Sequence, residues 1–250
     1  MRFPEIPSGA DVLRRAYTVR AGDADGGGRL TPSGFCEMFF DAAGRHAHAL
    51  GVSVDDLIAR GHTWMLSRFA FRVEAYPRRW DDVTVSTWPS GRDRLFAYRD
   101  FLATGPDGVP FGGGSTAWLV IDLDARRPLR ISDVLDEHKV WFPEGLPEHH
   151  PEKLPDAGIA DAGAGIPVRW DDIDFNEHVT SGSYIRWALE AVPPEVRTAR
   201  VLKAFTINFL SETFHGETVT TSSAADGSVY RHAIRSADGR ELVRARSEWV

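Results

Sequence analysis

Apolar residues recur at every third or fourth position between Thr31 and Gly51, and this spacing predicts one long amphipathic helix. Thr31 followed by proline is a suitable helix start, and Gly51 is a suitable stop. A strand is predicted ahead of this helix over residues 17–20, after a polar lead-in over 1–15. A second, short helix is predicted over residues 54–59.

From residue 63 onwards the hydrophobic period changes from helical spacing to alternation, which is typical of half-buried strands. Four strands are predicted, at residues 64–73, 82–90, 95–104 and 115–123. Clusters of glycine, proline and aspartate separate them, as turns require. The first half of the chain therefore predicts a strand, a long helix and an antiparallel meander.

Residues 133–165 interrupt this pattern with repeated prolines and glycines, which is the composition of a linker. The pair His149-His150 raises the question of a metal site. No third ligand follows at helical or hairpin spacing, so a solvated linker is the favoured interpretation. We predict an N-terminal domain over residues 1–132 and a C-terminal domain over 166–250.

After the linker the first pattern returns, with a strand, a polar loop, a helix and a second meander. The helix is predicted over residues 180–191, and the strands over 166–170, 201–212, 217–224, 228–236 and 241–249. Asp-Gly pairs at 226–227 and 238–239 mark hairpin turns within this meander.

The two halves also match residue by residue. An offset of 149 places Arg20 on Arg169, Asp23 on Asp172, Asp25 on Asp174, Thr31 on Thr180 and Phe35 on Tyr184. Glu74 falls on Glu212 at an offset of 138, as shorter loops in the second half would produce. This order of matches predicts a tandem duplication. Asn176 and His178 stand where the first copy has Gly27 and Arg29, so chemistry is predicted in the second half.

The composition narrows the class of protein. Hydrophobic residues make up 42 % and charged residues 26 %, which is ordinary globular usage. A net charge of −7 argues against general nucleic-acid binding, which needs a basic face. A single cysteine, Cys36, excludes an internal disulfide framework and suits a reducing compartment. With no signal-like or membrane-spanning apolar run in the sequence, we expect a soluble, cytoplasmic protein without a membrane span.

The polar loop and the helix after it carry a specific motif. Asp172-x-Asp174-x-Asn176-x-His178-Val179, followed by Tyr184-Ile185-x-Trp187-x-Leu189-Glu190, resembles the acyl-acyl-carrier-protein (acyl-ACP) thioesterases of plants and bacteria. Trp64-Met65-Leu66-Ser67-Arg68 and Tyr98-Arg99-Asp100 in the first half are similar to that family as well. The resemblance implies an α+β fold of two tandem hotdog domains, each a long helix wrapped by an antiparallel sheet. It also implies hydrolysis of a medium- or long-chain acyl thioester on acyl carrier protein, without a metal or organic cofactor.

Carried over by position, the family's catalytic set is Asp174, Asn176 and His178, with Glu212 after the next strand. Thr213 stands where the family commonly has a cysteine, which disfavours a cysteine nucleophile and favours attack by water. Asp174 and Glu212 are candidates to orient or deprotonate that water, and the sequence leaves open which is the base. Asn176 offers an amide donor, and His178 can donate or accept a proton near neutral pH.

Each of these residues also has a purely structural interpretation. Asp172 has a counterpart, Asp23, in the other copy, so a turn or cap role is favoured for it. Asp174 has a counterpart too, and only the family motif favours a functional role. The candidate substrate-binding residues are core residues by default and acyl-chain contacts by resemblance: Phe35, Met38, Phe39, Trp64, Met65 and Tyr184.

Several alternatives remain open at this point. An acyl-CoA thioesterase of the same fold and a non-catalytic acyl-binding protein both fit the patterns, and a hotdog dehydratase fits them less well. An acidic carrier protein could dock on any of the arginine-rich spots, of which Arg78-Arg79 is one. Whether the chain forms a homodimer is also undecided.

Overall fold

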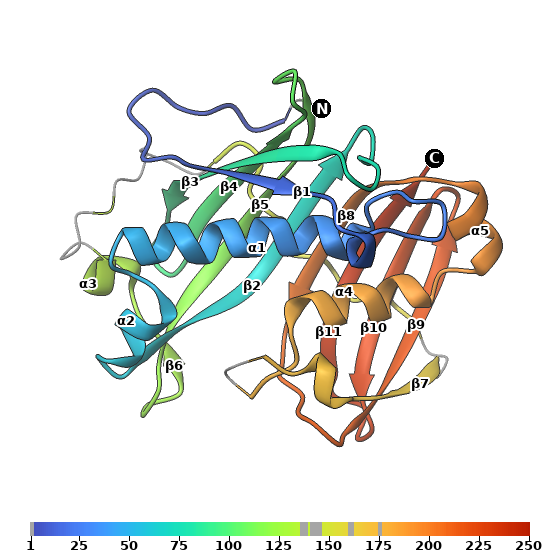
Figure 1. Cartoon of the computed structure of the whole chain (residues 1–250). Coiled ribbons are helices and arrows are strands. Elements are labelled where there is room, and N and C mark those ends of the chain that lie inside the picture. The colour runs from blue at the N-terminus through green and yellow to red at the C-terminus, as the bar shows by residue number, and fades with distance from the viewer. Residues whose placement is uncertain (1–2, 136–139, 141–146, 160–162, 175–176) are drawn as a thin grey trace. The chain divides into compact units, whose positions relative to one another are not determined.

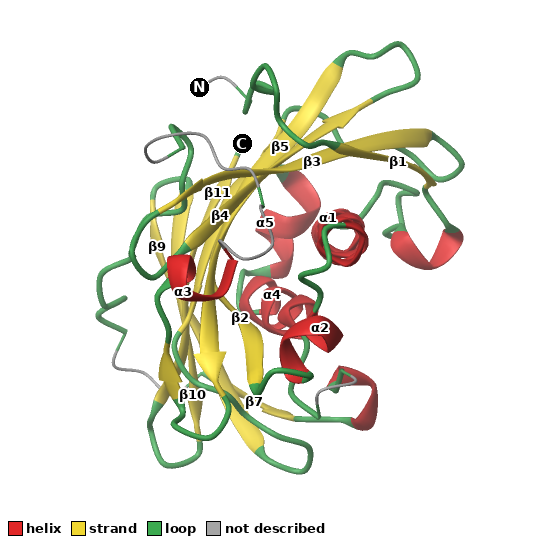
Figure 2. Cartoon of the chain, turned by 90° about the vertical axis from the view of Figure 1, so that its left-hand side faces the viewer, coloured by secondary structure: helices red, strands yellow, loops and turns green. Residues whose placement is uncertain are grey.

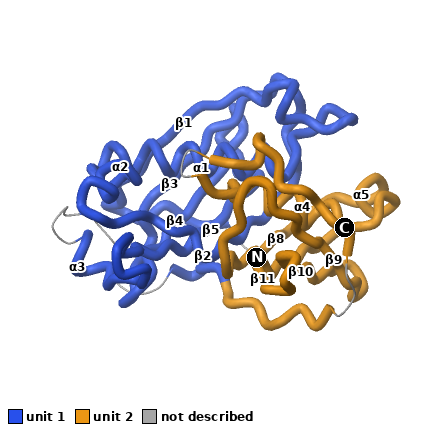
Figure 3. Tube along the Cα trace, turned by 90° about the horizontal axis from the view of Figure 1, so that it is seen from below, with its two compact units in different colours: residues 1–151 blue, residues 152–250 orange. Residues whose placement is uncertain are grey.

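A computed structural model of the chain describes residues 3–135, 140, 147–159, 163–174 and 177–250. The chain divides into two compact units, residues 1–151 and residues 152–250 (Figure 3). Each unit is described by itself below.

Unit 1 is one long helix packed on an antiparallel sheet. Its elements are β1 (Leu13–Thr18), α1 (Pro32–Ala49), α2 (Val54–Ile58), β2 (His62–Val73), β3 (Asp82–Arg92), β4 (Ala97–Thr104), β5 (Pro110–Asp122), β6 (Arg127–Pro128) and α3 (Ile131–Leu135), with a short 3-10 turn, η1 (Ala21–Asp23) (Figure 1). The strands are ordered β1-β3-β4-β5-β2, and α1 contacts β3 and β1. Figure 2 shows α1 lying along one face of these strands.

Aromatic side chains fill the space between α1 and the sheet. Phe39 on α1 stacks on Phe101 of β4, with ring centroids 4.7 Å apart, and Phe35 meets Phe71 of β2 at 5.7 Å. Phe35 and Phe39 are fully buried. A Cβ added at Gly112 of β5 would lie 2.7 Å from the Phe35 ring. Glycine there lets the helix approach the sheet closely.

Unit 2 repeats this arrangement with shorter elements. They are β7 (Ala164–Pro167), the 3-10 turn η3 (Trp170–Asp172), α4 (Ser181–Glu190), α5 (Pro194–Ala199), β8 (Leu202–Phe209), β9 (Thr218–Asp226), β10 (Val229–Ser236) and β11 (Glu241–Trp249). The strand order is β7-β9-β10-β11-β8, which is the order β1-β3-β4-β5-β2 of unit 1. The repeated topology is what the predicted duplication requires.

The predicted helices and meander strands are present, and the differences lie at their ends. β1 begins at Leu13 instead of residue 17, because residues taken for a polar lead-in pair with β3, Leu13 opposite Thr87. β5 begins at Pro110, five residues early. β8 ends at Phe209, so Glu212 lies in the connection to β9 and not at a strand end. The elements α3, α5 and β6 were not predicted.

Part of the segment predicted as a linker packs against the sheet of unit 2. The Leu154 N–H donates to Asn208 Oδ1 of β8 at 2.8 Å, and the Arg231 guanidinium donates to the Ala157 carbonyl at 2.7 Å. Ala157 packs on Ala233 of β10. The domain boundaries themselves stay a prediction.

Two further properties concern the described part of the chain. None of its helices is both long and apolar enough to cross a membrane. Its His, Cys, Asp and Glu side chains form no group of three or more that could hold a metal ion. In unit 1, His150 of the histidine pair rests edge-on against Tyr98, with ring centroids 6.0 Å apart.

Candidate active site

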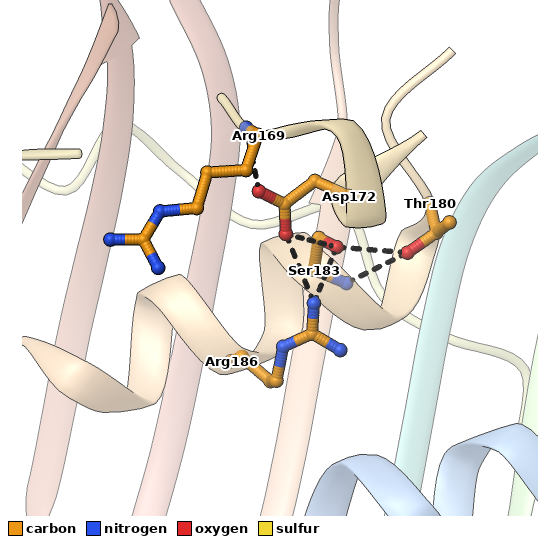
Figure 4. A network of polar contacts seen from close by, with 5 residues as sticks. All are labelled: Arg169, Asp172, Thr180, Ser183 and Arg186. Atoms are coloured by element: carbon orange, nitrogen blue, oxygen red, sulfur yellow. Dashed lines mark hydrogen bonds and ion pairs between the residues drawn. The ribbon is translucent and has the colours of Figure 1, made fainter. Parts of the chain in front are cut away.

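The polar loop of unit 2 is anchored at Asp172, the last residue of η3. The Asp172 carboxylate is buried and accepts hydrogen bonds from the Arg169 N–H at 3.0 Å and the Ser183 hydroxyl at 2.9 Å. The Arg186 guanidinium of α4 also donates to it, at 3.0 Å (Figure 4). The Asp172 carbonyl accepts from the Thr180 N–H, and Thr180 caps α4 by accepting from the Ser183 N–H. Asp172 therefore has the structural role that its counterpart in the first copy suggested.

Above this anchor the loop is a tight hairpin that presents His178. Ile173 and Val179 form an antiparallel bridge, and the Asp174 N–H donates to the His178 carbonyl at 2.8 Å. In return the His178 N–H donates to Asp174 Oδ1 at 3.2 Å. Glu177 lies at the turn with φ +64°, a left-handed conformation that non-glycine residues seldom adopt. The Asp174 carboxylate thus fixes the backbone from which the imidazole projects.

A second loop, between β8 and β9, carries Glu212. The next residue, Thr213, is fully buried, and its hydroxyl makes a very short hydrogen bond to Glu217 Oε2. The Phe214 N–H donates to the same oxygen at 3.4 Å. Burial raises the pKa of Tyr184, which lies on α4, above its usual value, and a hydrogen bond between this side chain and the main chain of Thr213 joins α4 to the loop. The loop is therefore held at Thr213, by Glu217 through the side chain and by Tyr184 through the main chain.

The two loops bring His178 and Glu212 together. Nε2 of His178 lies 3.9 Å from Oε1 of Glu212, and both side chains are a little over one-third exposed. Phe214 packs edge-on against the imidazole, with ring centroids 5.5 Å apart. A separation of 3.9 Å is long for a direct hydrogen bond and suits two groups that share one water molecule.

The predicted catalytic set is thus partly assembled. His178 and Glu212 are neighbours, and Asp174 reaches His178 through its main chain. Asn176 lies outside the described residues. Asp174 also matches its counterpart in geometry, because Asp25 Oδ1 accepts from the Arg29 N–H at 2.9 Å in the first copy. The contacts of Asp174 therefore fit a loop-forming carboxylate as well as a catalytic one.

The candidate substrate-binding residues lie in the cores of their own units. Phe35, Phe39, Met38 and Tyr184 are buried. Trp64 is half-buried and donates from its indole nitrogen to the Val52 carbonyl at 2.7 Å; Met65 is half-buried beside it on β2. These placements fit core packing and leave contact with an acyl chain as a prediction.

The matching loop of unit 1 is closed by main-chain contacts. The Leu30 N–H donates to the Pro77 carbonyl at 2.8 Å, the Arg79 N–H donates to the Gly28 carbonyl at 2.9 Å, and Arg29 forms a bridge with Arg78. The connection involved is two residues longer than in unit 2. The longer connection runs from Glu74 to Asp81, and the shorter one runs from Glu212 to Glu217. Asp81 and Glu217 are equivalent because their carbonyls accept from the N–H groups of Val19 and Val168, which follow the matching strands.

Three residues of the site were not found from the sequence. Arg186 aligns with Glu37 and Ser183 with Gly34, so the duplication gave no reason to select either. Glu217 aligns with Asp81, whose carboxylate likewise holds its own loop by accepting from the Arg78 N–H at 2.7 Å. An acid retained at that point in both copies was a usable signal.

Comparison with known proteins identifies matches to both halves. Residues 10–138 match the family model described as the acyl-ACP thioesterase N-terminal domain, and residues 160–250 match the one described as the acyl-ACP thioesterase C-terminal domain. A chloroplastic acyl-[acyl-carrier-protein] hydrolase of Cuphea viscosissima is 28 % identical over 257 residues, covering 95 % of the chain. The chain spans 62 % of that relative's length.

Two solved structures share the fold. An acyl-ACP thioesterase from Bacteroides thetaiotaomicron superposes with a TM-score of 0.87 at 22 % identity, over 96 % of this chain and 98 % of that one. The 12:0-ACP thioesterase from Umbellularia californica gives 0.84 at 24 % identity, over 96 % and 97 %. The predicted α+β tandem hotdog architecture is confirmed by this likeness.

Proposed function

Because the chain belongs to the acyl-ACP thioesterase family, we propose that it hydrolyses the thioester of a medium- or long-chain acyl-ACP to a free fatty acid and the carrier thiol. The observation that carries this proposal is the pairing of His178 with Glu212 at 3.9 Å, where the two loops meet. A carboxylate and an imidazole at that separation can act on one water molecule.

The proposed reaction uses Glu212 as the general base. Glu212 accepts a proton from water as the water oxygen bonds to the thioester carbonyl carbon. When the tetrahedral intermediate collapses, the carbon–sulfur bond breaks and the proton passes to the departing sulfur. Hydrolysis is then balanced without an external proton.

The other residues orient and stabilise the reacting groups. His178 orients the attacking water from its neighbouring position. Asn176 is proposed to donate its amide hydrogens to the carbonyl oxygen, where negative charge develops. Asp174 is proposed to keep His178 in place through the main-chain contacts already described. Of the two candidate carboxylates, Glu212 is favoured as the base because it faces the imidazole.

Substrate and partner are part of the proposal. The relatives are named for acyl carrier protein, and we propose an acidic carrier protein as the partner, in the cytoplasm. Phe35, Met38, Phe39, Trp64, Met65 and Tyr184 are proposed to contact the acyl chain, and their apolar character supports this.

The experiment that tests the proposal is thiol release from acyl-ACP and acyl-CoA carrying the same acyl chain, over chains from medium to long. We expect release from acyl-ACP with higher kcat/KM than from acyl-CoA. A clear preference for acyl-CoA would replace the carrier protein by CoA as the partner. Absence of release from every thioester would overturn the proposal in favour of an acyl-binding protein.

A further inference from the structure

We propose that Arg186 and Ser183 are positioning residues that fix the catalytic loop through Asp172. This inference rests on the proposed function, because it concerns how His178 is held toward Glu212. Neither residue touches His178 or Glu212 in the described contacts, and both act on the base of the loop from α4 (Figure 4).

The contacts form one small network. Arg186 donates to Asp172 Oδ1 at 3.0 Å and to the Ser183 hydroxyl oxygen at 2.7 Å, and the Ser183 hydroxyl in turn donates to Asp172 Oδ1. The Asp172 side chain is about 10 % exposed, so a charge there needs partners. The Arg186 and Ser183 groups supply them, and they belong to a helix that is itself packed on β9, β10 and β11.

The first copy holds the same carboxylate in another way. Asp23 is bound by the guanidinium of Arg20, its neighbour three positions back, at 2.8 and 3.0 Å. The helix of unit 1 offers nothing comparable at this point, because Gly34 and Glu37 occupy the positions of Ser183 and Arg186. A Cβ at Gly34 would lie only 3.1 Å from the Asp23 carbonyl oxygen. In unit 1 the partner of the aspartate is thus an exposed arginine of the loop itself, whereas in unit 2 the partners are side chains of the helix.

The described part of the second loop meets its neighbouring connection in a different way from the first loop. In unit 1 the main chain of the loop is joined to the β2–β3 connection by the contacts of Gly28, Arg29 and Leu30. In the described part of unit 2, residues 177–180 meet residues 212–217 through the side chains of His178, Glu212 and Phe214. The described backbone of this loop is held at its base, where the Asp172 carboxylate accepts from the α4 side chains.

Loss of this anchor is expected to affect turnover more than binding. Ile173 and Val179 form the bridge at the two ends of the loop. Their outer neighbours Asp172 and Thr180 are joined by a hydrogen bond from the Thr180 N–H to the Asp172 carbonyl. A shift at this base displaces His178 relative to Glu212, and displacements of about 1 Å can reduce catalytic rates on the order of 100-fold. A partial loosening should therefore lower kcat about tenfold.

The test is steady-state thiol release from acyl-ACP by Arg186→Met, Arg186→Lys and Ser183→Ala, with the melting temperature of each. Arg186→Met is expected to lower kcat about tenfold with KM unchanged, and Arg186→Lys to restore most of the loss. If Arg186→Met does not fold, Ser183→Ala removes the hydroxyl that donates to Asp172 and accepts from Arg186, and is expected to lower kcat a few-fold, about threefold. Arg186→Met added to His178→Ala should cause no further loss, because the positioned group is gone.

Arg20→Met is the matched control, since it removes the guanidinium from the equivalent aspartate in unit 1. It should leave kcat and KM unchanged. A folded Arg186→Met enzyme with wild-type kcat, or an equal loss of kcat in Arg20→Met, would overturn the inference. A wild-type protein that releases no thiol would overturn the proposed function instead, so the two failures are distinguishable.

Discussion

The described residues of the loops at 20–31 and 169–180 make matching main-chain contacts and face different neighbours. In each, an aspartate accepts the N–H four positions on, and in each a threonine caps the following helix. The first loop is joined to the neighbouring connection by main-chain contacts, while the second leaves His178 beside Glu212. On the proposed function, a duplicated scaffold keeps the main-chain contacts of its loop and confines chemistry to one copy by changing what lies across from that loop.

The largest expected effect comes from removing the imidazole. His178→Ala should lower kcat/KM for acyl-ACP by about 1,000-fold, because general acid–base groups contribute on this scale. Arg29→Ala changes the equivalent position in unit 1 and should leave kcat/KM unchanged. Thiol release followed spectroscopically measures both, and equal losses in the two variants would contradict the division of labour between the copies.

The core beneath α4 should respond to acid. His232 of β10 stands where unit 1 has Phe101. In β11 the Trp249 indole donates to the Ser247 hydroxyl, as the Trp118 indole donates to Thr116 in β5, and this aligns the two strands. In that alignment His232 lies opposite Ala245 where Phe101 lies opposite Gly114. Burial lowers the pKa of His232 to about 4. Above pH 6.5 the imidazole is neutral in both folded and unfolded chains. Between pH 6.5 and 4 the unfolded chain takes up a proton that the folded chain excludes. The free energy of unfolding therefore decreases as the pH is lowered through this range.

For His232 this loss amounts to about 3 kcal/mol by pH 4. His232→Gln removes the titrating group and should reduce the fall of the melting temperature between pH 7 and 4. Some acid loss should persist in that variant, because burial also lowers the pKa of His46 in unit 1 to about 4. Identical pH profiles of melting for wild type and His232→Gln would show that this imidazole does not titrate as its burial implies.

A smaller effect is expected at the acid that holds the Glu212 loop. Glu217→Ala removes the acceptor for Thr213 and Phe214 and should lower kcat about tenfold by loosening Glu212. Glu217→Gln keeps an acceptor oxygen and should lose less. Asp81→Ala makes the same change in unit 1, and we expect it to leave kcat as in the wild type. A fall in kcat for Asp81→Ala would mean that the loops of both copies support catalysis.

The smallest effect should come from copying the catalytic residues into the first loop. Gly27→Asn with Arg29→His, introduced into the His178→Ala protein, should leave its residual rate unchanged. The main-chain contacts of Gly28 and Leu30 remain in that variant and keep the new imidazole away from a reacting group. A gain in thiol release over His178→Ala would show that side-chain identity, and not closure of the loop, separates the two copies.

The repetition of elements could be predicted from the sequence because it depends on local patterns. The apolar spacing of α1 and the alternation in β2 to β5 were sufficient to find these elements. That the single-copy Asn176 and His178 mark the half with chemistry stays a prediction. The family motif indicated Glu212, although the strand before it is shorter than the alternation suggested. These signals lie within one element or repeat at a fixed offset.

The anchors of the site could not be predicted because they depend on which side chains face each other after folding. Arg186 lies 14 positions from Asp172, and its counterpart Glu37 has the opposite charge. The closure of the first loop involves backbone groups some 50 positions apart, which carry no residue signature. The start of β1 was predicted four residues late for a related reason, since its pairing with β3 fixes residues whose own pattern is weak.

The two extra residues between Glu74 and Asp81 have a consequence for the history of the chain. A point substitution that removed a catalytic side chain could be reversed by another substitution. Closing the loop with a longer connection is harder to undo, because deletion and substitution would have to occur together. On the proposed function, the first copy is released from selection for turnover and free to diverge, with its loop joined to the neighbouring connection by two main-chain hydrogen bonds.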